Sequence, residues 1–321
     1  MWLAIASLVL PLLLVGGPAP AQTPSHLSTL EYQDLRLARL AETMLRANRR
    51  LCNRLMPLTG LVLHTRDQYS GAVGEAFANG NVAIAAIVPG SAADRASLSP
   101  GDGISEINAI RLDDLPAPDE GPMRDAVFQV LAEQDTGSPV TLAIARGGIV
   151  SEVVLQAQPG CRALVEILSS EGKVARSDGR VIQLSYGLAS QLTDESLAAV
   201  FAHEMAHLVL EHRRRLAEAG INKGLLAEFG RNQRSNRQAE VEADRLSVHL
   251  LANAGLDPQI APRFWLSKEG RRVDAGLLRS AIYPSPSARA ELMRQEIAEY
   301  LPSGTGPSYP EHLLALREME F

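Results

Sequence analysis

The stretch AVFAHEMAHLVLEH, residues 199–212, places two histidines and a glutamate in a run that otherwise has the apolar character of a buried helix. Ionisable groups are costly to bury unless they are paired or bind a metal. His203 and His207 are four residues apart, so on a helix both imidazoles project from one face, about one turn apart. The spacing therefore predicts a buried helix with two side chains that can reach one ion.

Glu204 completes the pattern HExxH, in which the two histidines hold zinc and the glutamate acts as a general base. The alternative, two satisfied core histidines, gives no reason for Glu204. Thr193 is suited to an N-cap, and Arg213–Arg215 suit the last turn of a helix because they complement its dipole. We therefore predict one helix from Thr193 to Arg215, with His203 and His207 as metal ligands and Glu204 as the catalytic base.

A catalytic zinc site usually has three protein ligands and a water, so a third ligand must exist. Glu211 lies too far along the same helix, about 12 Å from His203 at about 1.5 Å per residue. The ligand must therefore come from another element, and a second amphipathic helix is predicted over residues 239–255. Three acidic residues lie near its start: Glu240, Glu242 and Asp244. Glu240 and Asp244 share one face, while Glu242 points roughly the opposite way. Acids on one face can serve as a ligand and as the carboxylate that accepts the other N–H of a zinc-bound histidine.

HExxH followed about thirty residues later by EVEAD resembles one family of zinc metallopeptidases. This family contains the HtpX heat-shock proteases, the CAAX prenyl endopeptidases and the BepA-like periplasmic proteases. The resemblance spans roughly residues 161–300. It implies one zinc ion per chain, with Glu240 as the third ligand and Asp244 holding His203.

The segment YPSPSAR, residues 283–289, resembles the His-Pro…Arg element of the same family, with Tyr283 in place of the histidine. Beyond the metal, Tyr283 is our first candidate for stabilising the charge that develops on the substrate oxygen, and Arg289 is the second. A Pro-capped helix start with an ordinary surface arginine is the alternative for this segment.

Residues 57–160 have a different sequence pattern, in which short β-rich runs are separated by Gly, Pro, Asp and Asn. The stretch IVPGSAADRASLSPGDGISEINAI, residues 87–110, resembles the core of a PDZ domain, with Ser97 and Ala109 at positions where glycine is usual. PDZ domains commonly bind a peptide C-terminus by strand addition. The loop expected to bind such a ligand is the run LTGL, that is Leu58, Thr59, Gly60 and Leu61; a plain turn is the alternative.

The first residues have the pattern of an export signal, with an apolar run followed by small residues up to Ala21. An uncleaved anchor is the alternative. Cys52 and Cys161 flank the β-rich segment, and in an exported protein we predict a disulfide between them rather than two free thiols. No later run is apolar enough to span a membrane. The net charge of −6, with no dominant basic face, gives no indication of a nucleic-acid partner.

The sequence thus predicts an α+β protein, in which a mainly helical zincin-type metallopeptidase domain with a small sheet accompanies a PDZ-like β-rich domain. The predicted order is a signal peptide at 1–21, an N-terminal helix within 22–56, the PDZ-like domain at 57–160 and the metallopeptidase domain at 161–321. The small sheet, from residues 163–170 and 180–185, is expected at the substrate cleft.

The predicted function is a zinc-dependent endopeptidase of the periplasm or another exported location, acting on envelope or misfolded proteins. The alternative is a PDZ-bearing periplasmic chaperone or adaptor whose zinc site is structural or latent.

Overall fold

The computed structural model describes residues 27–69, 76–119, 121–221, 230–277, 284–301 and 306–321. The segment predicted to be a signal peptide, residues 1–21, lies outside these ranges. The described helices are α1 Leu27–Ala47, α2 Ala92–Arg95, α3 Met123–Ala132, α4 Tyr186–Ala189, α5 Asp194–Val209, α6 His212–Glu218, α7 Gly230–Asn253, α8 Ile260–Leu266, α9 Lys268–Leu277, α10 Pro286–Tyr300 and α11 Glu311–Leu314. The described strands are β1 Leu55–Leu58, β2 Leu61–Thr65, β3 Val82–Ile87, β4 Gly103–Ile107, β5 Ile110–Arg111, β6 Val140–Arg146, β7 Ile149–Leu155, β8 Gln158–Cys161, β9 Leu164–Leu168, β10 Ala175–Ser177 and β11 Val181–Ser185.

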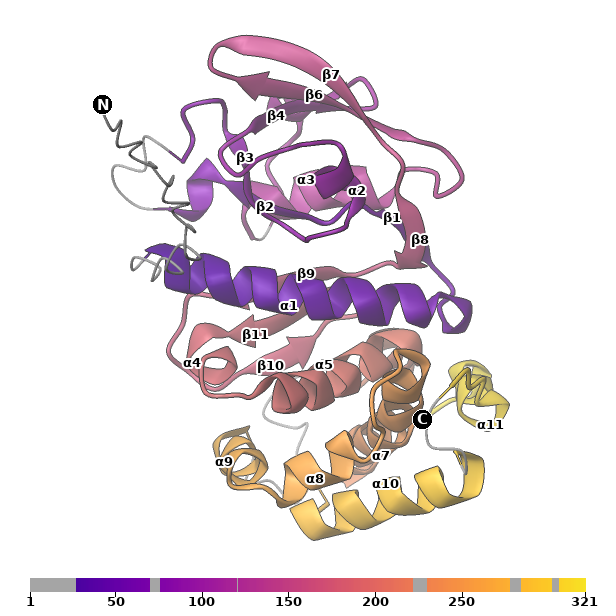
Figure 1. Ribbon diagram of the computed structural model, residues 1–321. Coiled ribbons are helices and arrows are strands. Elements are labelled where there is room, and N and C mark those ends of the chain that lie inside the picture. The colour runs from indigo at the N-terminus through magenta and orange to yellow at the C-terminus, as the bar shows by residue number, and fades with distance from the viewer. Residues whose placement is uncertain (1–26, 70–75, 120, 222–229, 278–283, 302–305) are drawn as a thin grey trace, which may run out of the picture.

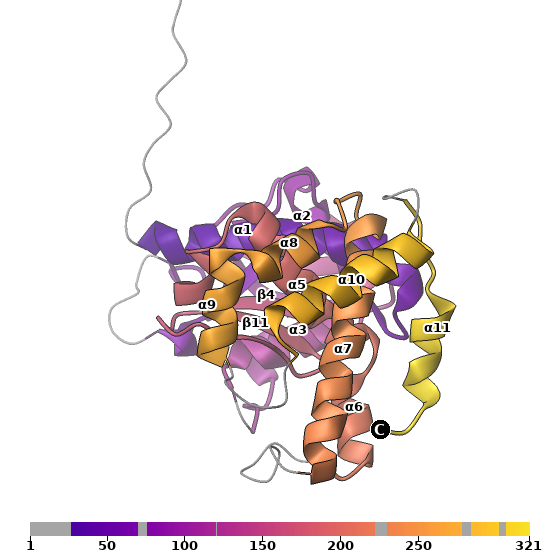
Figure 2. The same ribbon diagram turned by 90° about the horizontal axis from the view of Figure 1, so that it is seen from below.

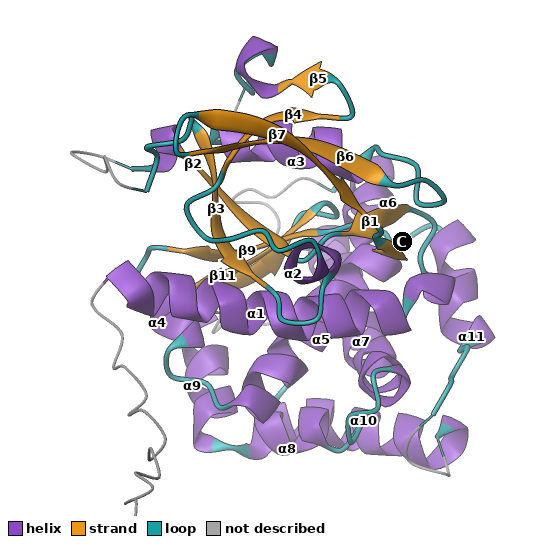
Figure 3. Cartoon of the chain, turned by 45° about the horizontal axis from the view of Figure 1, so that its top comes forward, coloured by secondary structure: helices purple, strands orange, loops and turns teal. Residues whose placement is uncertain are grey.

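The largest sheet has the order β2-β3-β4-β6-β7, with β5 paired to β4, and all its pairings are antiparallel. Its apolar residues form a core of their own, in which Ile84, Ile107 and Leu142 are almost fully buried. The short β-rich runs predicted within residues 57–160 correspond to the strands β2, β3, β4, β6 and β7. The mixture of this sheet with the helices of the second half confirms the predicted α+β class (Figure 3).

Two turns of this β-rich unit adopt a backbone conformation that normally favours glycine. Ser97 has φ of 58° and Ala109 has φ of 66°, both in the left-handed region. These are the two positions at which the sequence departs from the glycines usual in PDZ domains. For a residue with a Cβ atom, the left-handed conformation costs about 1–2 kcal/mol relative to the right-handed form. The rest of the fold must therefore offset this conformational energy at Ser97 and at Ala109.

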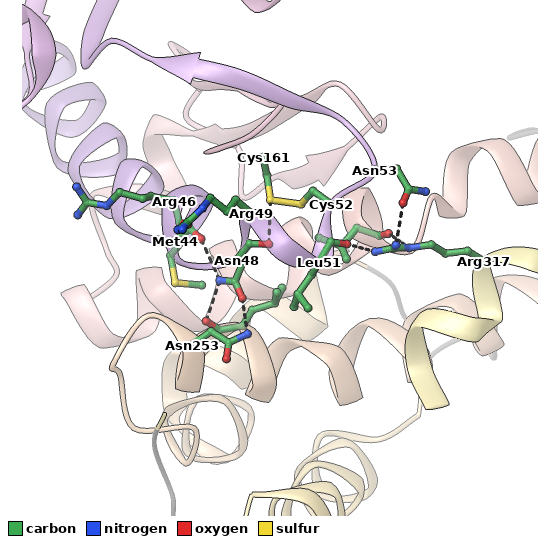
Figure 4. Close-up of a disulfide and its surroundings, with 12 residues drawn as sticks. Met44, Arg46, Asn48, Arg49, Leu51, Cys52, Asn53, Cys161, Asn253 and Arg317 are labelled. Carbon is green, nitrogen blue, oxygen red and sulfur yellow. Dashed lines mark hydrogen bonds between the residues drawn. A yellow bond between two sulfur atoms is a disulfide. The ribbon is translucent and has the colours of Figure 1, made fainter. Parts of the chain in front are cut away.

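Strands β1 and β8 form a separate two-stranded antiparallel sheet, which the sequence analysis did not predict. Its register places Leu55 opposite Cys161, so the predicted domain boundaries at residues 57 and 160 fall inside this sheet. Cys52 and Cys161 are joined by a disulfide beside it, across 109 residues of chain (Figure 4). In the chain-entropy account, closing a loop of that length stabilises the folded state by up to about 5 kcal/mol.

Helix α1 lies between the large sheet and the small sheet β10-β11-β9 (Figure 1). Leu37 and Met44 bury its apolar face in the core shared with the helical half. The buried carboxylate of Asp34 accepts a hydrogen bond from the backbone N–H of Ile167, at 2.9 Å, and lies 3.3 Å from His64 Nε2. Because these contacts belong to β9 and β2, Asp34 connects α1 to both sheets.

The end of α1 also binds the helical half. Asn48 donates from Nδ2 to the carbonyl of Leu250 at 3.1 Å, and Asn253 donates to Asn48 Oδ1 at 2.9 Å (Figure 4). Arg317, near the C-terminus, donates to the carbonyl oxygens of Leu51 and Val209. The disulfide, the end of α1 and the C-terminal segment thus meet at one place.

In the helical half, α7 packs against both α5 and α10 (Figure 2). The predicted single helix from Thr193 to Arg215 is wrong in its second part. Thr193 does cap α5 by accepting from Ser196 N–H, but α5 ends at Val209. Glu211 then takes a left-handed conformation, with φ of 53°, and α6 begins at the next residue. A left-handed residue breaks a helix because it redirects the chain.

Of the helices that the structure describes, none combines the length and apolar character that a membrane span requires.

Candidate metal centre

The three predicted ligands come together between α5 and α7. His203 and His207 project from one face of α5, with their Nε2 atoms 3.2 Å apart. Glu240, on α7, lies with Oε2 3.1 Å from His203 Nε2 and Oε1 3.5 Å from His207 Nε2. The helix spacing places the two imidazoles one turn apart, and the packing of α7 on α5 brings the carboxylate to both of them.

The donor set fits a zinc ion. Tetrahedral zinc, with bonds of about 2.0–2.1 Å to histidine nitrogen and carboxylate oxygen, requires its donor atoms to lie about 3.3 Å apart. The two Nε2 atoms, 3.2 Å apart, and Glu240 Oε2, 3.1 Å from His203 Nε2, lie close to this spacing, and the other carboxylate oxygen, Oε1, is 3.5 Å from His207 Nε2. Two imidazoles and one carboxylate are also the ligands of several catalytic zinc sites, which keep a fourth position open for water.

Asp244 lies on the other side of His203, one helical turn beyond Glu240. Its Oδ1 is 3.1 Å from His203 Nδ1, and its side chain is fully buried. Histidine ligands commonly donate their second N–H to a carboxylate, which fixes the ring orientation and the tautomer. The contact between Asp244 and His203 that the family resemblance implied is therefore present in the geometry.

Arg289 occupies a different place from the one expected for a group that stabilises the substrate oxygen. Its guanidinium binds Asp244 with two contacts of 2.6 Å, from Nε and Nη2. It also stacks on Trp265, with Cζ 3.4 Å from the ring centroid, and it is 2% exposed. Its Nη2 atom also lies 3.4 Å from His203 Nδ1 and 4.0 Å from Glu240 Oε2. Because Arg289 contacts the ligands and their carboxylate partner, the geometry favours a positioning role for it. Tyr283, the other candidate, lies outside the described residues.

The electrostatics of the three donors suit a divalent cation. Burial lowers the pKa of an imidazole, but hydrogen bonds to Asp244 and Glu240 raise the pKa of His203 to about 10. Burial also holds the pKa of His207 well below its usual value. Burial alone would raise the pKa of Glu240. The charges of the two histidines and the hydrogen bond from His203 instead lower this pKa strongly. His203 therefore holds a proton between two carboxylates, and binding a metal would release it.

The break after α5 creates a contact that the sequence analysis missed. His212 Nδ1 lies 2.8 Å from His207 Nδ1, and His212 Nε2 lies 3.1 Å from Glu242 Oε2. Arg215 donates to the same Glu242 oxygen at 2.6 Å. On an unbroken helix, His212 would be five residues beyond His207 and on another face. No motif in the sequence signals this arrangement, because it depends on the left-handed Glu211.

The sequence predicts that Glu242 points away from the face that carries Glu240 and Asp244. It does point away from the three donors, but it reaches the metal centre through His212. If His207 binds an ion through Nε2, its Nδ1–H can donate to His212 Nδ1, and His212 Nε2–H can donate to the Glu242 carboxylate. His212 and Glu242 thus orient His207 as Asp244 orients His203.

We expect His212→Ala to weaken zinc binding by about 10–100-fold, the usual cost of removing a hydrogen-bonding partner of a metal ligand. His212→Gln, which keeps a polar group in the same place, should recover part of the affinity. Zinc affinity is measured by competition with a chromophoric chelator, with His64→Ala as the matched loss of another buried histidine. Equal affinity in His212→Ala and His64→Ala would contradict the positioning role.

The predicted peptide-binding loop lies away from this centre, between β1 and β2. Leu58 and Thr59 are buried, and the Thr59 carbonyl accepts a hydrogen bond from Ala93 N–H. Gly60 has φ of 76°, and a Cβ atom there would lie 2.0 Å from the side chain of Ser91. Glycine is therefore required at this turn. The loop, with Leu61, lines a cavity whose other walls include residues of α1, α3 and β9.

Two similarities to known proteins bear on this site. Residues 174–231 match the sequence profile of peptidase family M48, and this stretch contains His203, Glu204 and His207 but ends before Glu240. The chain is also similar to a protein of Vibrio cholerae serotype O1 that is named as a beta-barrel assembly-enhancing protease. The two are 27% identical over 170 residues, which cover 43% of this chain and 35% of that protein.

These matches confirm the resemblance to this peptidase family, and with it the expected class of enzyme, a metallopeptidase. The chain spans about a third of the length of the curated relative that it matches.

Proposed function

We propose that this chain is a zinc-dependent endopeptidase in which His203, His207 and Glu240 hold the ion and Glu204 is the general base. The observation that carries the proposal is the convergence of these three side chains, whose nitrogen and oxygen atoms approach to 3.1–3.5 Å, beside a glutamate on the helix that carries both histidines. Asp244, Arg289, His212 and Glu242 support the ligands from behind. A site built in this way has ligands, oriented rings and a base.

The chemistry follows from the positions of these groups. A zinc ion bound there lowers the pKa of a water to about 7 and polarises the carbonyl of the bond to be cleaved. Glu204 follows His203 in α5 and is buried, with 8% of its surface exposed. Its carboxylate accepts the proton of the attacking water and delivers it to the leaving amine as the C–N bond breaks. The remaining groups of the site keep the two imidazoles in position.

The small sheet is the proposed place for the substrate. Its order is β10-β11-β9, so β10 is an edge strand, and β10 packs against α5. An extended peptide can add to such an edge through backbone hydrogen bonds. This would align its carbonyl groups along the helix that carries His203 and Glu204. Because most of that recognition is by the backbone, the proposed substrates are unfolded or extended protein segments.

We further propose that the protein works outside the cytoplasm. The disulfide between Cys52 and Cys161 supports this location, since such bonds persist in oxidising compartments. The export-like pattern of residues 1–21 agrees with it. Because the Vibrio cholerae relative is named for enhancing beta-barrel assembly, envelope proteins are the proposed substrate class.

The β-rich unit at residues 57–160 is proposed to be a PDZ-like module that binds a peptide C-terminus. The cavity lined by Thr59, Gly60, Leu61, Phe128 and Leu131 supports a site between β2 and α3. Helix α1 contributes Ala41 and Leu45 to the same cavity. A bound peptide would therefore contact α1 as well as the sheet.

A chaperone or adaptor with a structural zinc site is the alternative function. A structural site is usually closed by four protein ligands, whereas three donors converge here next to a base. That donor set favours the enzyme.

Chelation of the purified protein tests the proposal. The metal-loaded enzyme should cleave reduced, carboxymethylated casein, an unfolded substrate. Removing the metal with 1,10-phenanthroline should abolish cleavage, and adding zinc should restore it. Metal content is measured in the same samples. Stable zinc content without cleavage of casein or of isolated outer-membrane proteins would instead support the adaptor.

A further inference from the structure

We propose a second metal site in this chain, formed by His249, Glu296 and His312, which takes a divalent transition-metal ion such as Zn²⁺. It goes beyond the proposed function, because these residues belong neither to the catalytic donors nor to their supporting groups. Among the described residues, these are the only three His, Cys, Asp or Glu residues besides the first set whose ligand atoms lie within 4.8 Å of one another.

The donor atoms converge on one point. Glu296 Oε1 lies 3.0 Å from His249 Nε2 and 2.8 Å from His312 Nε2. Three elements supply them, because His249 is on α7, Glu296 is on α10 and His312 is on α11. The separations are a few tenths of an ångström shorter than the spacing of about 3.3 Å in tetrahedral zinc. An ion would replace the shared protons and move the donors apart slightly.

The outer atoms of two donors are held as in a metal site. His249 Nδ1 lies 2.7 Å from Ser308 Oγ, which leaves Nε2 directed at the carboxylate. Glu296 Oε2 accepts a hydrogen bond from Arg245 Nε at 2.6 Å, which leaves Oε1 for the two imidazoles. Such contacts fix ligand orientation, and they accompany nearly all metal-bound histidines. The catalytic centre has the same construction, with Arg289 beside its carboxylates.

Charge and burial favour a cation here. His249 and Glu296 are almost completely buried, and an isolated carboxylate in that position would be expensive. Arg245 pairs with one oxygen of that carboxylate, Oε2, and the two imidazoles face the other, Oε1.

The site is also accessible from solvent. The side chain of His312 is 28% exposed, and it stacks on Tyr300 with ring centroids 3.9 Å apart. Both line a surface cavity with Ser308 and Tyr309. An ion can reach the donors from this cavity, and water can complete its coordination there. Imidazole and carboxylate together suit zinc and its neighbours rather than calcium or magnesium.

The second site shares two helices with the first. His249 follows Glu240 by nine residues on α7, about 13 Å along the axis at about 1.5 Å per residue. Glu296 follows Arg289 by seven residues on α10, which packs against α7 (Figure 2). An ion there would therefore fasten helix α11 to α7 and α10, which carry Glu240, Asp244 and Arg289 of the first site. Its role is structural.

Metal counting on protein purified without a histidine tag tests this proposal. We expect about two zinc ions per chain in the wild type, about one in His312→Ala, about one in His203→Ala and none in the double variant. Glu311→Ala, an exposed neighbour on the same helix, is the matched control and should keep both ions. Added zinc should raise the melting temperature of His203→Ala but not of the double variant.

Each outcome separates the two proposals. Equal metal content in the wild type and His312→Ala overturns the second site, whatever the count. Loss of one ion from His312→Ala while casein cleavage continues supports it. If His312→Ala does not fold, His203→Ala decides: one retained ion supports the second site, and none overturns it. One ion in the wild type and none in His312→Ala would support the second site while contradicting the catalytic one.

Discussion

Replacing Glu204 by glutamine should lower the rate of casein hydrolysis by at least about 10²–10⁴-fold, the usual contribution of a general base. The reason is that an amide cannot accept the proton of the attacking water. Glu204 is not among the three converging donors, so zinc content should stay at the wild-type level. The buried helix around it should remain folded, because glutamine has nearly the same size. Activity, zinc content and melting temperature are measured on the same preparations.

The pattern of these three measurements identifies the role of Glu204. Loss of cleavage with unchanged zinc and stability indicates a catalytic base. His203→Ala provides the contrast, because it should lose cleavage together with the catalytic zinc. A Glu204→Gln variant that cleaves casein as fast as the wild type would refute the mechanism, even if zinc is present.

Much of the metal centre follows from local rules. The spacing of His203 and His207 determines a shared helix face, and four-residue spacing likewise places Glu240 and Asp244 on one face of α7. The packing of α7 on α5 then brings these two faces together. The strands of the large sheet could be predicted equally well, because runs rich in β-branched and apolar residues are separated by Gly, Pro, Asp and Asn.

The rest depends on interactions that no short window contains. His212 reaches His207 only because Glu211 adopts a left-handed backbone, supported by hydrogen bonds from Asn53 and Arg214. Asn53 is 158 residues away, so the break could not be anticipated from the helical pattern. Strand β1 was missed for a similar reason, because its partner β8 is about a hundred residues further along the chain.

Arg289 illustrates a third difficulty. Its distance from the catalytic helix in the sequence gives no direction for its side chain, and a surface position or an oxyanion role looked equally open. In the structure, Arg289 pairs with Asp244, and its guanidinium lies over the ring of Trp265. Trp265 itself carried no signal, although it lies edge-on to His203 with centroids 6.2 Å apart. Such contacts arise from tertiary packing rather than from a motif.

Glu240→Ala should remove the catalytic zinc. Glu240 contacts both histidines, so its loss leaves only two ligands for the ion. It also leaves the buried Nε2 atom of His203 without its carboxylate partner. Losing a residue that only hydrogen-bonds to a ligand costs about 10–100-fold in metal affinity. Losing the ligand Glu240 should lower zinc affinity by more than this, and casein cleavage should fall as well. Stability should also drop, because zinc present at about 100 times its dissociation constant stabilises the folded state by about 2.7 kcal/mol.

The measurement is sharpest in the His312→Ala background, where any ion that remains belongs to the catalytic centre. Glu242→Ala is unsuitable as a control, since Glu242 orients His207 through His212. Glu218→Ala serves instead, because that glutamate is exposed and pairs only at the surface with Arg214. If Glu240→Ala and Glu218→Ala retain zinc equally and cleave casein equally, Glu240 is not a ligand. A third donor would then have to come from another part of the chain, because a catalytic zinc with two protein ligands would lack the usual set.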